Sequence, residues 1–293
     1  MNASGSGEPG TLPGLYVHIP FCSARCAYCD FTSFAGRDDL MDAYGEALDA
    51  ELAASAERWG LFGTVFVGGG TPSVLGAERL AALVASLARR ADLSRCTEFT
   101  IEMNPESVDD ALAEAVAGAV GAVRPGILRV SLGAQSFDDG VLRTAGRVHT
   151  AGQIAAAVSR LRRSGVRNLS VDLMLGLPGQ SPVCLVRDVS AALALEPEHL
   201  SFYALTVDPA TPLGRAGYEP DPDLQTDMYE CLVDMLGEKG YIRYEISNAA
   251  RPGHECRHNL GYWRYRPYAG FGCAAVSFDG KSRTTCVSDL DEY

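Results

Sequence analysis

The sequence predicts an α/β fold, a partial (β/α)6 barrel followed by an antiparallel extension. Six short β-rich runs alternate with amphipathic helical stretches along most of the 293 residues, and this alternation favours one α/β unit. The strand cores are continuous in Val, Ile and Leu, as expected for a parallel sheet with both faces covered. Glycine and polar residues follow several strands at the same end, which is the edge where parallel α/β folds bind ligands.

Each predicted strand precedes a predicted helix or a set of helical pieces. The strands are expected at residues 14–19, 64–69, 98–104, 127–136, 169–179 and 199–206. The helices are expected at residues 38–58, 77–90, 108–120, 182–195 and 224–239, with short helical pieces from the end of the 127–136 strand through Leu161. Six units of this kind are two fewer than a complete (β/α)8 barrel contains.

The two ends of the chain differ in composition from the barrel region, which we place at residues 15–240. Residues 1–14 are small and polar, and they are expected to form a flexible tail. Residues 241–293 are rich in aromatic residues and glycine, and they are expected to form the antiparallel extension. The final DLDEY reads as the beginning of a helix with no terminating signal, so we expect the chain to be cut short there.

Composition excludes several classes of function. The net charge of −12 argues against a nucleic-acid partner bound through a broad basic surface. No run of eighteen or more apolar residues is present, so no membrane span is expected. The nine cysteines are odd in number and unevenly placed, and the chain lacks a secretion signal. These features favour a reducing cytoplasm, in which clustered cysteines indicate metal or redox chemistry.

The cysteine cluster has the spacing C-x3-C-x2-C and consists of Cys22, Cys26 and Cys29. Three close thiolates favour soft metals, either zinc or an iron–sulfur cluster. A zinc site would need a fourth ligand, such as His18 or a distant cysteine. His18 lies within a predicted strand, however, and is expected to be a core histidine. A [4Fe–4S] cluster with three cysteines would keep one iron open for a substrate or cofactor.

With Tyr28 directly before its last cysteine, this motif resembles the signature of the radical S-adenosylmethionine (SAM) family. The resemblance implies a partial (β/α)6 barrel of the radical SAM type, in agreement with the six units counted above. It also implies a [4Fe–4S] cluster whose open iron is chelated by the amino and carboxylate groups of SAM. An electron from the cluster then breaks a C–S bond and releases a 5′-deoxyadenosyl radical.

A wider resemblance is to the branch containing the oxygen-independent coproporphyrinogen III oxidase and its relatives. The motifs LYVHIPFC, GGGTP, IEMNPES, SLGAQSFDD, GRVHT and DLMLGLPGQ occur in the order of that branch. The resemblance implies SAM contacts from residues at the matching motif positions and places Tyr28 beside the cofactor and cluster. The SAM-contacting positions are Tyr16, Gly69, Gly70, Thr71, Glu102, Gln135, Arg147, Asp172 and Ala204.

This branch contains two different functions. The oxidase decarboxylates a porphyrinogen, and its cysteine motif carries one more cysteine where this chain has Phe31. Heme chaperones of the branch have the C-D-F form and an H-N-x-x-Y-W motif, which this chain matches at HNLGYW. The resemblance implies heme binding by His258, Asn259, Tyr262 and Trp263. A histidine can serve as an axial ligand, and the aromatic rings offer flat apolar surface. Cys256, His254 and Cys273 are further candidate ligands.

We therefore expect a radical SAM-type heme chaperone that delivers heme to acceptor hemoproteins, with membrane-associated respiratory enzymes among the candidate acceptors. The alternative is an oxygen-independent coproporphyrinogen III oxidase of porphyrin biosynthesis, and a third possibility is a zinc-bound α/β protein without SAM. No catalytic residue is assigned, and the sequence leaves open whether SAM is cleaved or only bound. The family normally continues into a small C-terminal helical domain beyond the last residues of this chain.

Overall fold

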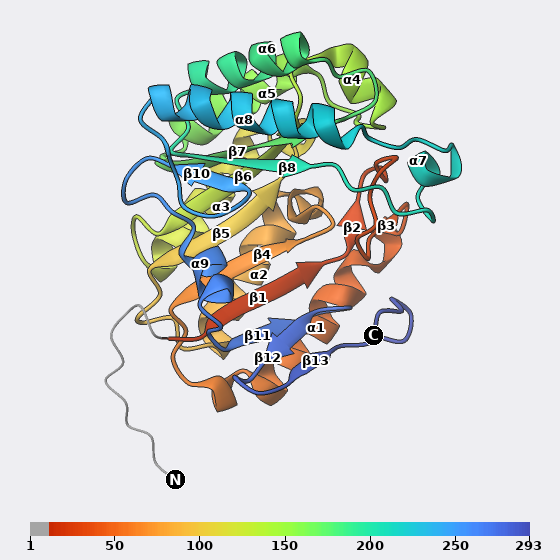
Figure 1. The fold of residues 1–293 in the computed structure, drawn as a ribbon. Coiled ribbons are helices and arrows are strands. Elements are labelled where there is room, and N and C mark those ends of the chain that lie inside the picture. The colour runs from red at the N-terminus through yellow and green to blue at the C-terminus, as the bar shows by residue number, and fades with distance from the viewer. Residues whose placement is uncertain (1–11) are drawn as a thin grey trace.

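The computed structural model describes residues 12–293 of the chain (Figure 1). Most of the predicted tail, residues 1–11, lies outside the described residues. Eleven strands form one sheet, in the order β13-β12-β11-β1-β4-β5-β6-β7-β8-β10-β9. Its centre is a run of six parallel strands. They are β1 (Gly14–Ile19), β4 (Thr64–Gly69), β5 (Glu98–Met103), β6 (Leu128–Gln135), β7 (Asn168–Leu175) and β8 (His199–Ala204).

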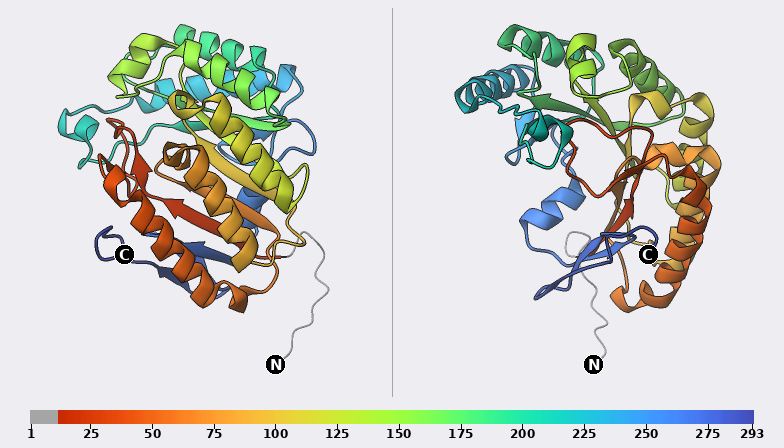
Figure 2. Two further views of the ribbon diagram at one scale, coloured as in Figure 1. Left: turned by 180° about the vertical axis from the view of Figure 1, so that it is seen from behind. Right: turned by 90° about the vertical axis from the view of Figure 1, so that its right-hand side faces the viewer.

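Helices connect these strands and cover the outer face of the sheet (Figure 2). The long helices are α1 (Met41–Ser55), α2 (Gly76–Arg90), α3 (Asp110–Val123), α5 (Ala151–Arg163), α6 (Pro182–Ala194) and α8 (Pro222–Glu238). Two shorter helices are α4 (Asp139–Thr144) and α7 (Pro212–Arg215), and single 3-10 turns lie at Asp38–Leu40, Glu57–Trp59, Pro72–Leu75 and Pro105–Ser107. The predicted partial barrel of six β-α units is confirmed.

Local sequence signals explain where several helices begin. The side chain of Asp109 accepts a hydrogen bond from the amide of Leu112 and caps α3. Thr150 and Gln153 form a capping box at the start of α5. Both arrangements satisfy amide groups that have no partner within the first helical turn. The strands owe their position to buried Val, Ile and Leu side chains, which join the inner faces of the helices in one main core.

The C-terminal extension divides between the two edges of the sheet. At one edge, β10 (Asn248–Ala250) pairs antiparallel with β8 and with β9 (Ile242–Arg243). At the other, β11 (Tyr268–Phe271) pairs with β1, and β12 (Val276–Phe278) and β13 (Arg283–Thr285) continue antiparallel from it. The prediction of antiparallel strands is confirmed for these pairs, but β11 is parallel to β1. The chain reaches β11 from β10, on the opposite side of the sheet, through a connection that contains α9 (Arg257–Trp263), and it enters beside β1 in the parallel direction.

Two further segments position the site. The short strands β2 (Phe21–Cys22) and β3 (Phe34–Ala35) pair with each other and bracket the cysteine loop. Helix α9 lies on the opposite side of the sheet from α1 and α2 (Figure 2), and its His258 ring contacts Phe66 of β4. Residues 290–292, where a helix was expected to begin, form a turn. None of the described helices is long and apolar enough to cross a membrane.

Candidate functional site

Three thiols gather just after β1, at the C-terminal edge of the parallel strands. Cys22 ends β2, and Cys26 and Cys29 lie in the loop that follows. The amide of Cys29 donates to the carbonyl of Cys26 (3.2 Å) and closes a tight turn. The amide of Ala27 donates to the carbonyl of Ala145 (3.0 Å), which ties the loop to the segment after α4. The loop is therefore held from within and from a neighbouring part of the rim.

The glycine-rich segment after β4 packs directly against the first cysteine. The amide of Gly70 donates to Ile19 O (2.8 Å), and the amide of Thr71 donates to Phe21 O (2.7 Å). A Cβ atom at Gly70 would lie 2.6 Å from Phe21 O and 3.0 Å from Cys22 Sγ. Only glycine fits at this position without displacing the chain. The hydroxyl of Thr71 lies 3.4 Å from Cys22 Sγ.

A cavity of about 380 Å³ opens beside the thiols. Every residue predicted to bind the cluster or SAM, apart from Tyr16, lines it. These residues are Cys22, Cys26, Cys29, Tyr28, Gly69, Gly70, Thr71, Glu102, Gln135, Arg147, Asp172 and Ala204. Tyr16 instead places its hydroxyl 3.0 Å from Nδ1 of His18 and packs its ring against Phe66. His18 is buried, and its Nε2 lies 2.9 Å from Thr32 O, as expected for a core histidine.

Two carboxyl groups face the cavity from neighbouring parts of the sheet. Oε2 of Glu102 accepts a hydrogen bond from the amide of Gly69 (3.2 Å). Burial, and then the negative charge of Asp172, raise the pKa of Glu102 from 4.5 to about 8. Asp172 accepts hydrogen bonds from the hydroxyls of Ser131 (3.1 Å) and Ser170 (3.0 Å). Burial raises the pKa of Asp172 as well. Both groups can accept hydrogen bonds from hydroxyls of a ligand.

Arg147 connects the cysteine loop to the sheet. Its Nη1 donates to Cys26 Sγ (3.3 Å), and its Nη2 donates to Asn104 Oδ1 (2.7 Å) and Gly133 O (2.9 Å). Asn104 in turn donates to the hydroxyl of Thr71 (3.1 Å). The Nε atom of Arg147 is buried without a hydrogen-bond partner among the described residues. A guanidinium held in this way can pair with a carboxylate that enters the cavity.

Gln135 reaches the cavity through an irregular strand end. The register between β6 and β7 shifts at Gly133 and Gln135, which marks a β-bulge, and Gln135 has a φ of 65°. Positive φ is uncommon outside glycine and carries a steric cost. A Cβ atom at Gly133 would lie 3.0 Å from Nε2 of Gln135. The bulge therefore directs the amide of Gln135 inward and leaves it space beside a glycine.

Two further residues, Arg129 and Tyr203, line the cavity from inside the strands and were not predicted from the sequence. Arg129 is 2% exposed, lines the cavity, and places Nη2 3.2 Å from Nδ1 of His199. A single arginine within an apolar strand is a signal that could have identified it. Tyr203 also lines the cavity, but the sequence of β8 gives no corresponding signal. Asn104 directly follows β5 and connects Arg147 with Thr71.

The donor chemistry of this cavity fits a [4Fe–4S] cluster together with SAM. Three soft sulfur donors lie on one wall, and carboxylate, amide and guanidinium groups lie on the others. Within residues 12–293, no three His, Cys, Asp or Glu side chains converge as they would on a single metal ion. A cubane does not require such convergence, because each cysteine binds a different iron.

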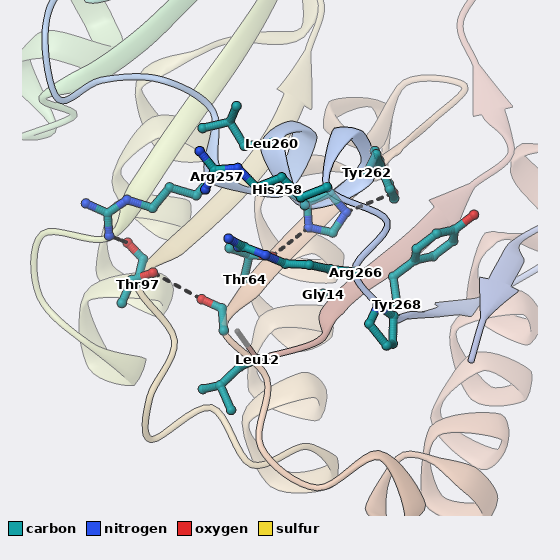
Figure 3. Close-up of a pocket in the computed structure, with 14 residues that line it drawn as sticks. Leu12, Gly14, Thr64, Thr97, Arg257, His258, Leu260, Tyr262, Arg266 and Tyr268 are labelled. Atoms are coloured by element: carbon teal, nitrogen blue, oxygen red, sulfur yellow. Dashed lines mark hydrogen bonds between the residues drawn. The ribbon is translucent and has the colours of Figure 1, made fainter. Parts of the chain in front are cut away.

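The HNLGYW motif forms helix α9 and lines a second cavity of about 260 Å³ (Figure 3). The carboxylate of Glu98 accepts hydrogen bonds from the amides of Arg257 (2.8 Å) and His258 (3.0 Å) at the start of this helix. A negative charge is favourable there because the first amides of a helix carry partial positive charge. Glu98 thus anchors α9 to the beginning of β5.

His258 is 3% exposed, and both of its ring nitrogens have partners (Figure 3). Nδ1 lies 2.9 Å from the hydroxyl of Thr64, and Nε2 lies 2.8 Å from the hydroxyl of Tyr262. Burial, and then the positive charge of Arg129, lower the pKa of His258 to about 3. The histidine is therefore neutral at physiological pH.

The other residues of the motif face in different directions. Asn259 lines the first cavity together with the cysteines, whereas Tyr262 lines the second. Tyr262 is 40% exposed and Trp263 is 53% exposed. The motif thus separates two cavities and presents aromatic surface to solvent.

The further candidate heme ligands lie away from the cavity that contains His258. Cys256 is fully buried, and its Sγ donates to Glu98 (3.4 Å). Cys273 is fully buried beside β11, and its amide donates to the hydroxyl of Tyr44 (3.0 Å). His254 is half-buried before α9. None of these three lines the cavity that contains His258.

Comparison with known proteins agrees with this geometry. Residues 16–190 match the radical SAM superfamily, and the chain belongs to that superfamily. Membership implies a [4Fe–4S] cluster and SAM. The prediction of a zinc-bound protein without SAM finds no support.

Three relatives show to which family within this superfamily the chain belongs. The heme chaperone HemW of Mycobacterium tuberculosis is 40% identical over 295 residues, which cover 97% of this chain and 74% of that protein. HemW of Bacillus subtilis is 38% identical, covering 96% and 75%. HemW of Lactococcus lactis is 37% identical, covering 95% and 73%. Within the superfamily, the chain belongs to the HemW family.

A solved structure shares the fold. Coproporphyrinogen III oxidase (HemN) from Escherichia coli superposes with a TM-score of 0.83 and 24% sequence identity. The match covers 98% of this chain and 69% of that chain. It confirms the radical SAM fold.

Proposed function

We propose that this chain is a radical SAM-type heme chaperone, which binds heme and transfers it to an acceptor hemoprotein. The observation that carries the proposal is the complete HNLGYW motif on α9 in a member of the HemW family. The last two residues of the motif, Tyr262 and Trp263, are exposed to solvent. Exposed aromatic rings near a histidine suit a flat apolar cargo that must also leave again.

The first cavity has a separate role in this proposal. Cys22, Cys26 and Cys29 hold the cluster, which when bound with SAM supplies one-electron chemistry at a single open iron. Glu102 and Asp172 accept hydrogen bonds from hydroxyl groups of the cofactor. The remaining cavity residues orient the cofactor or line its path, and they are Tyr28, Gly69, Gly70, Thr71, Gln135, Arg147 and Ala204. Tyr16 contributes from outside the cavity, through its contacts with His18 and Phe66.

His258 is the proposed axial ligand of the heme iron. The hydroxyl of Thr64 can accept the proton of Nδ1, which leaves the lone pair of Nε2 as the available donor. Nε2 is the nitrogen on the side of partly exposed Tyr262. Heme binding therefore requires the Tyr262 hydroxyl to leave Nε2 and the iron to replace it. Asn259, Tyr262 and Trp263 contact the porphyrin or its surroundings.

Phe31 separates this proposal from the oxidase alternative. It lines the mouth of the first cavity and is 65% exposed, at the position where the oxidase motif carries a further cysteine. The likeness to HemN supports a shared fold, whereas the sequence relatives are heme chaperones. We further propose a cytoplasmic location, with membrane-associated respiratory hemoproteins as acceptors.

The test begins with anaerobic reconstitution of the cluster. Hemin is then titrated into the protein and followed by the growth of a Soret band. The heme-loaded protein is mixed with the apo form of a respiratory cytochrome and, separately, with apomyoglobin as a passive scavenger. Transfer to the cytochrome should be faster than release to apomyoglobin. Decarboxylation of coproporphyrinogen III in the presence of SAM, without hemin binding, would favour the oxidase instead.

A further inference from the structure

The second cavity is bordered by three arginines, Arg257, Arg264 and Arg266. We call this group the arginine rim. Figure 3 shows the Arg266 side chain extending into the cavity beside His258, while Arg257 reaches toward Thr97. The guanidinium of Arg257 donates to Thr97 O (3.4 Å). The rim therefore lies beside the histidine and tyrosine of the HNLGYW motif.

The arginine rim has no negative partner among residues 12–293. No carboxylate there forms an ion pair with any of the three guanidinium groups. Residues 256–268 contain these three arginines and no Asp or Glu, in a chain whose net charge is −12. Burial, and then the positive charge of Arg264, lower the pKa of Arg266. Arginine side chains that border one cavity without a salt-bridge partner are characteristic of a site for an anion.

We propose that the arginine rim is a carboxylate-binding subsite. Resting on the heme-chaperone function above, its ligand is the pair of propionate groups of heme, held while His258 and the exposed aromatic rings contact the rest of the molecule. Arginine suits this role because its planar fork matches a carboxylate with two hydrogen bonds. Nearby Tyr262 and Trp263, 40% and 53% exposed, offer the apolar surface that the macrocycle needs.

The size of the cavity agrees with a subsite for one edge of a ligand. Its volume is about 260 Å³, whereas pockets that enclose a drug-sized ligand measure roughly 300–1,000 Å³. The polar edge of a tetrapyrrole can enter it while the apolar part lies outside against the aromatic rings. This arrangement leaves the cargo accessible to an acceptor protein.

The test compares the wild type with the variant Arg264→Gln/Arg266→Gln. The control is Arg58→Gln/Arg187→Gln, which removes the same charge from exposed positions away from α9. The ligands are metal-free protoporphyrin IX and its dimethyl ester in the same dilute detergent, and binding is followed by quenching of tryptophan fluorescence. A parallel titration uses hemin.

The rim variant should bind protoporphyrin IX about tenfold or more weakly than the wild type, since charge-assisted hydrogen bonds are lost. The control should bind it like the wild type. The ester should bind the wild type and the rim variant equally, which also shows that the variant keeps the aromatic surface. Equal affinity of the wild type and the rim variant for protoporphyrin IX would overturn the subsite and leave hemin binding by the wild type intact. Failure of the wild type to bind hemin would overturn the chaperone function and the subsite together.

Discussion

Arg147 places Nη1 3.3 Å from Sγ of Cys26, while its Nη2 is held by Asn104 and Gly133. A fixed positive charge therefore lies beside one of the proposed cluster ligands. Positive charge and hydrogen bonds to sulfur stabilise the reduced form of an iron–sulfur cluster. Arg147 thus connects the proposed cluster ligand Cys26 with the ends of β5 and β6.

The variant Arg147→Gln should lower the reduction potential of the reconstituted cluster by tens of millivolts, because it removes this charge. An anaerobic redox titration followed by EPR measures the shift. Arg143→Gln is the matched control, since Arg143 is exposed on α4 and does not line the cavity. An unchanged potential in Arg147→Gln would show that the guanidinium does not influence the cluster.

The raised pKa of Glu102 predicts a pH dependence of stability. Its carboxyl group has a pKa of about 8 in the folded protein against 4.5 ordinarily. Between these values the folded state binds more protons than the unfolded state, so this group lowers stability as pH rises from about 4.5 to 8. Glu102→Gln removes the effect. The variant should melt a few degrees higher than the wild type at pH 8, in the absence of SAM.

The same variant should bind SAM more weakly above a pH of about 8, because there it lacks the ionised carboxylate acceptor of the wild type. Thermal melts at pH 4.5 provide the internal control, since the stability difference between Glu102→Gln and the wild type should shrink there. A variant that gains the same stability at both pH values would argue against a titrating Glu102.

The positive φ of Gln135 predicts that a glycine there keeps or raises the stability of the fold while SAM binding weakens. Gln135 holds a φ of 65°, and Gly has no steric cost in that region. The variant Gln135→Gly should keep or raise the free energy of unfolding by about 1 kcal/mol, and it should weaken SAM binding. Urea denaturation and equilibrium dialysis measure the two effects.

Glu196 offers a matched control for this prediction. It has a φ of 50° after α6 and does not line the cavity. Glu196→Gly should relieve a similar backbone cost without changing the affinity for SAM. If both variants bind SAM like the wild type, the side chain of Gln135 has no part in the site.

The sequence predicted the barrel well because its signals are local. Continuous apolar runs placed the strands within a few residues, and the polar groups at their ends converged on one cavity. The parallel pairing of β11 was not predictable in this way, since it depends on the path of the connection through α9. Arg129 stands out in the sequence as a single arginine within an apolar strand, but only the assembled sheet shows that it faces the cavity.

The environment of His258 also could not be predicted from the sequence. Thr64 lies 194 positions away in the chain, and only the packing of α9 against β4 brings its hydroxyl to Nδ1. Motif matching identified the histidine without showing that it is buried and doubly hydrogen-bonded. This geometry changes the design of the decisive variants, since His258→Ala would remove buried hydrogen bonds as well as a ligand.

Thr64 and Tyr262 are the two hydroxyl partners of His258. Variants of these residues distinguish an effect on heme ligation from an effect on the stability of the fold. Thr64→Val should lower the free energy of unfolding by about 1–2 kcal/mol, and it should weaken hemin binding because Nδ1 loses the acceptor that fixes its proton. Tyr262→Phe should also destabilise the heme-free protein, yet its hemin affinity should match or exceed that of the wild type, since iron no longer competes with the hydroxyl for Nε2. Soret titrations and urea denaturation measure these effects, with Tyr265→Phe, 74% exposed, as the control. A tenfold loss of hemin affinity in Tyr262→Phe would identify the tyrosine hydroxyl, rather than Nε2 of His258, as the group that holds the iron.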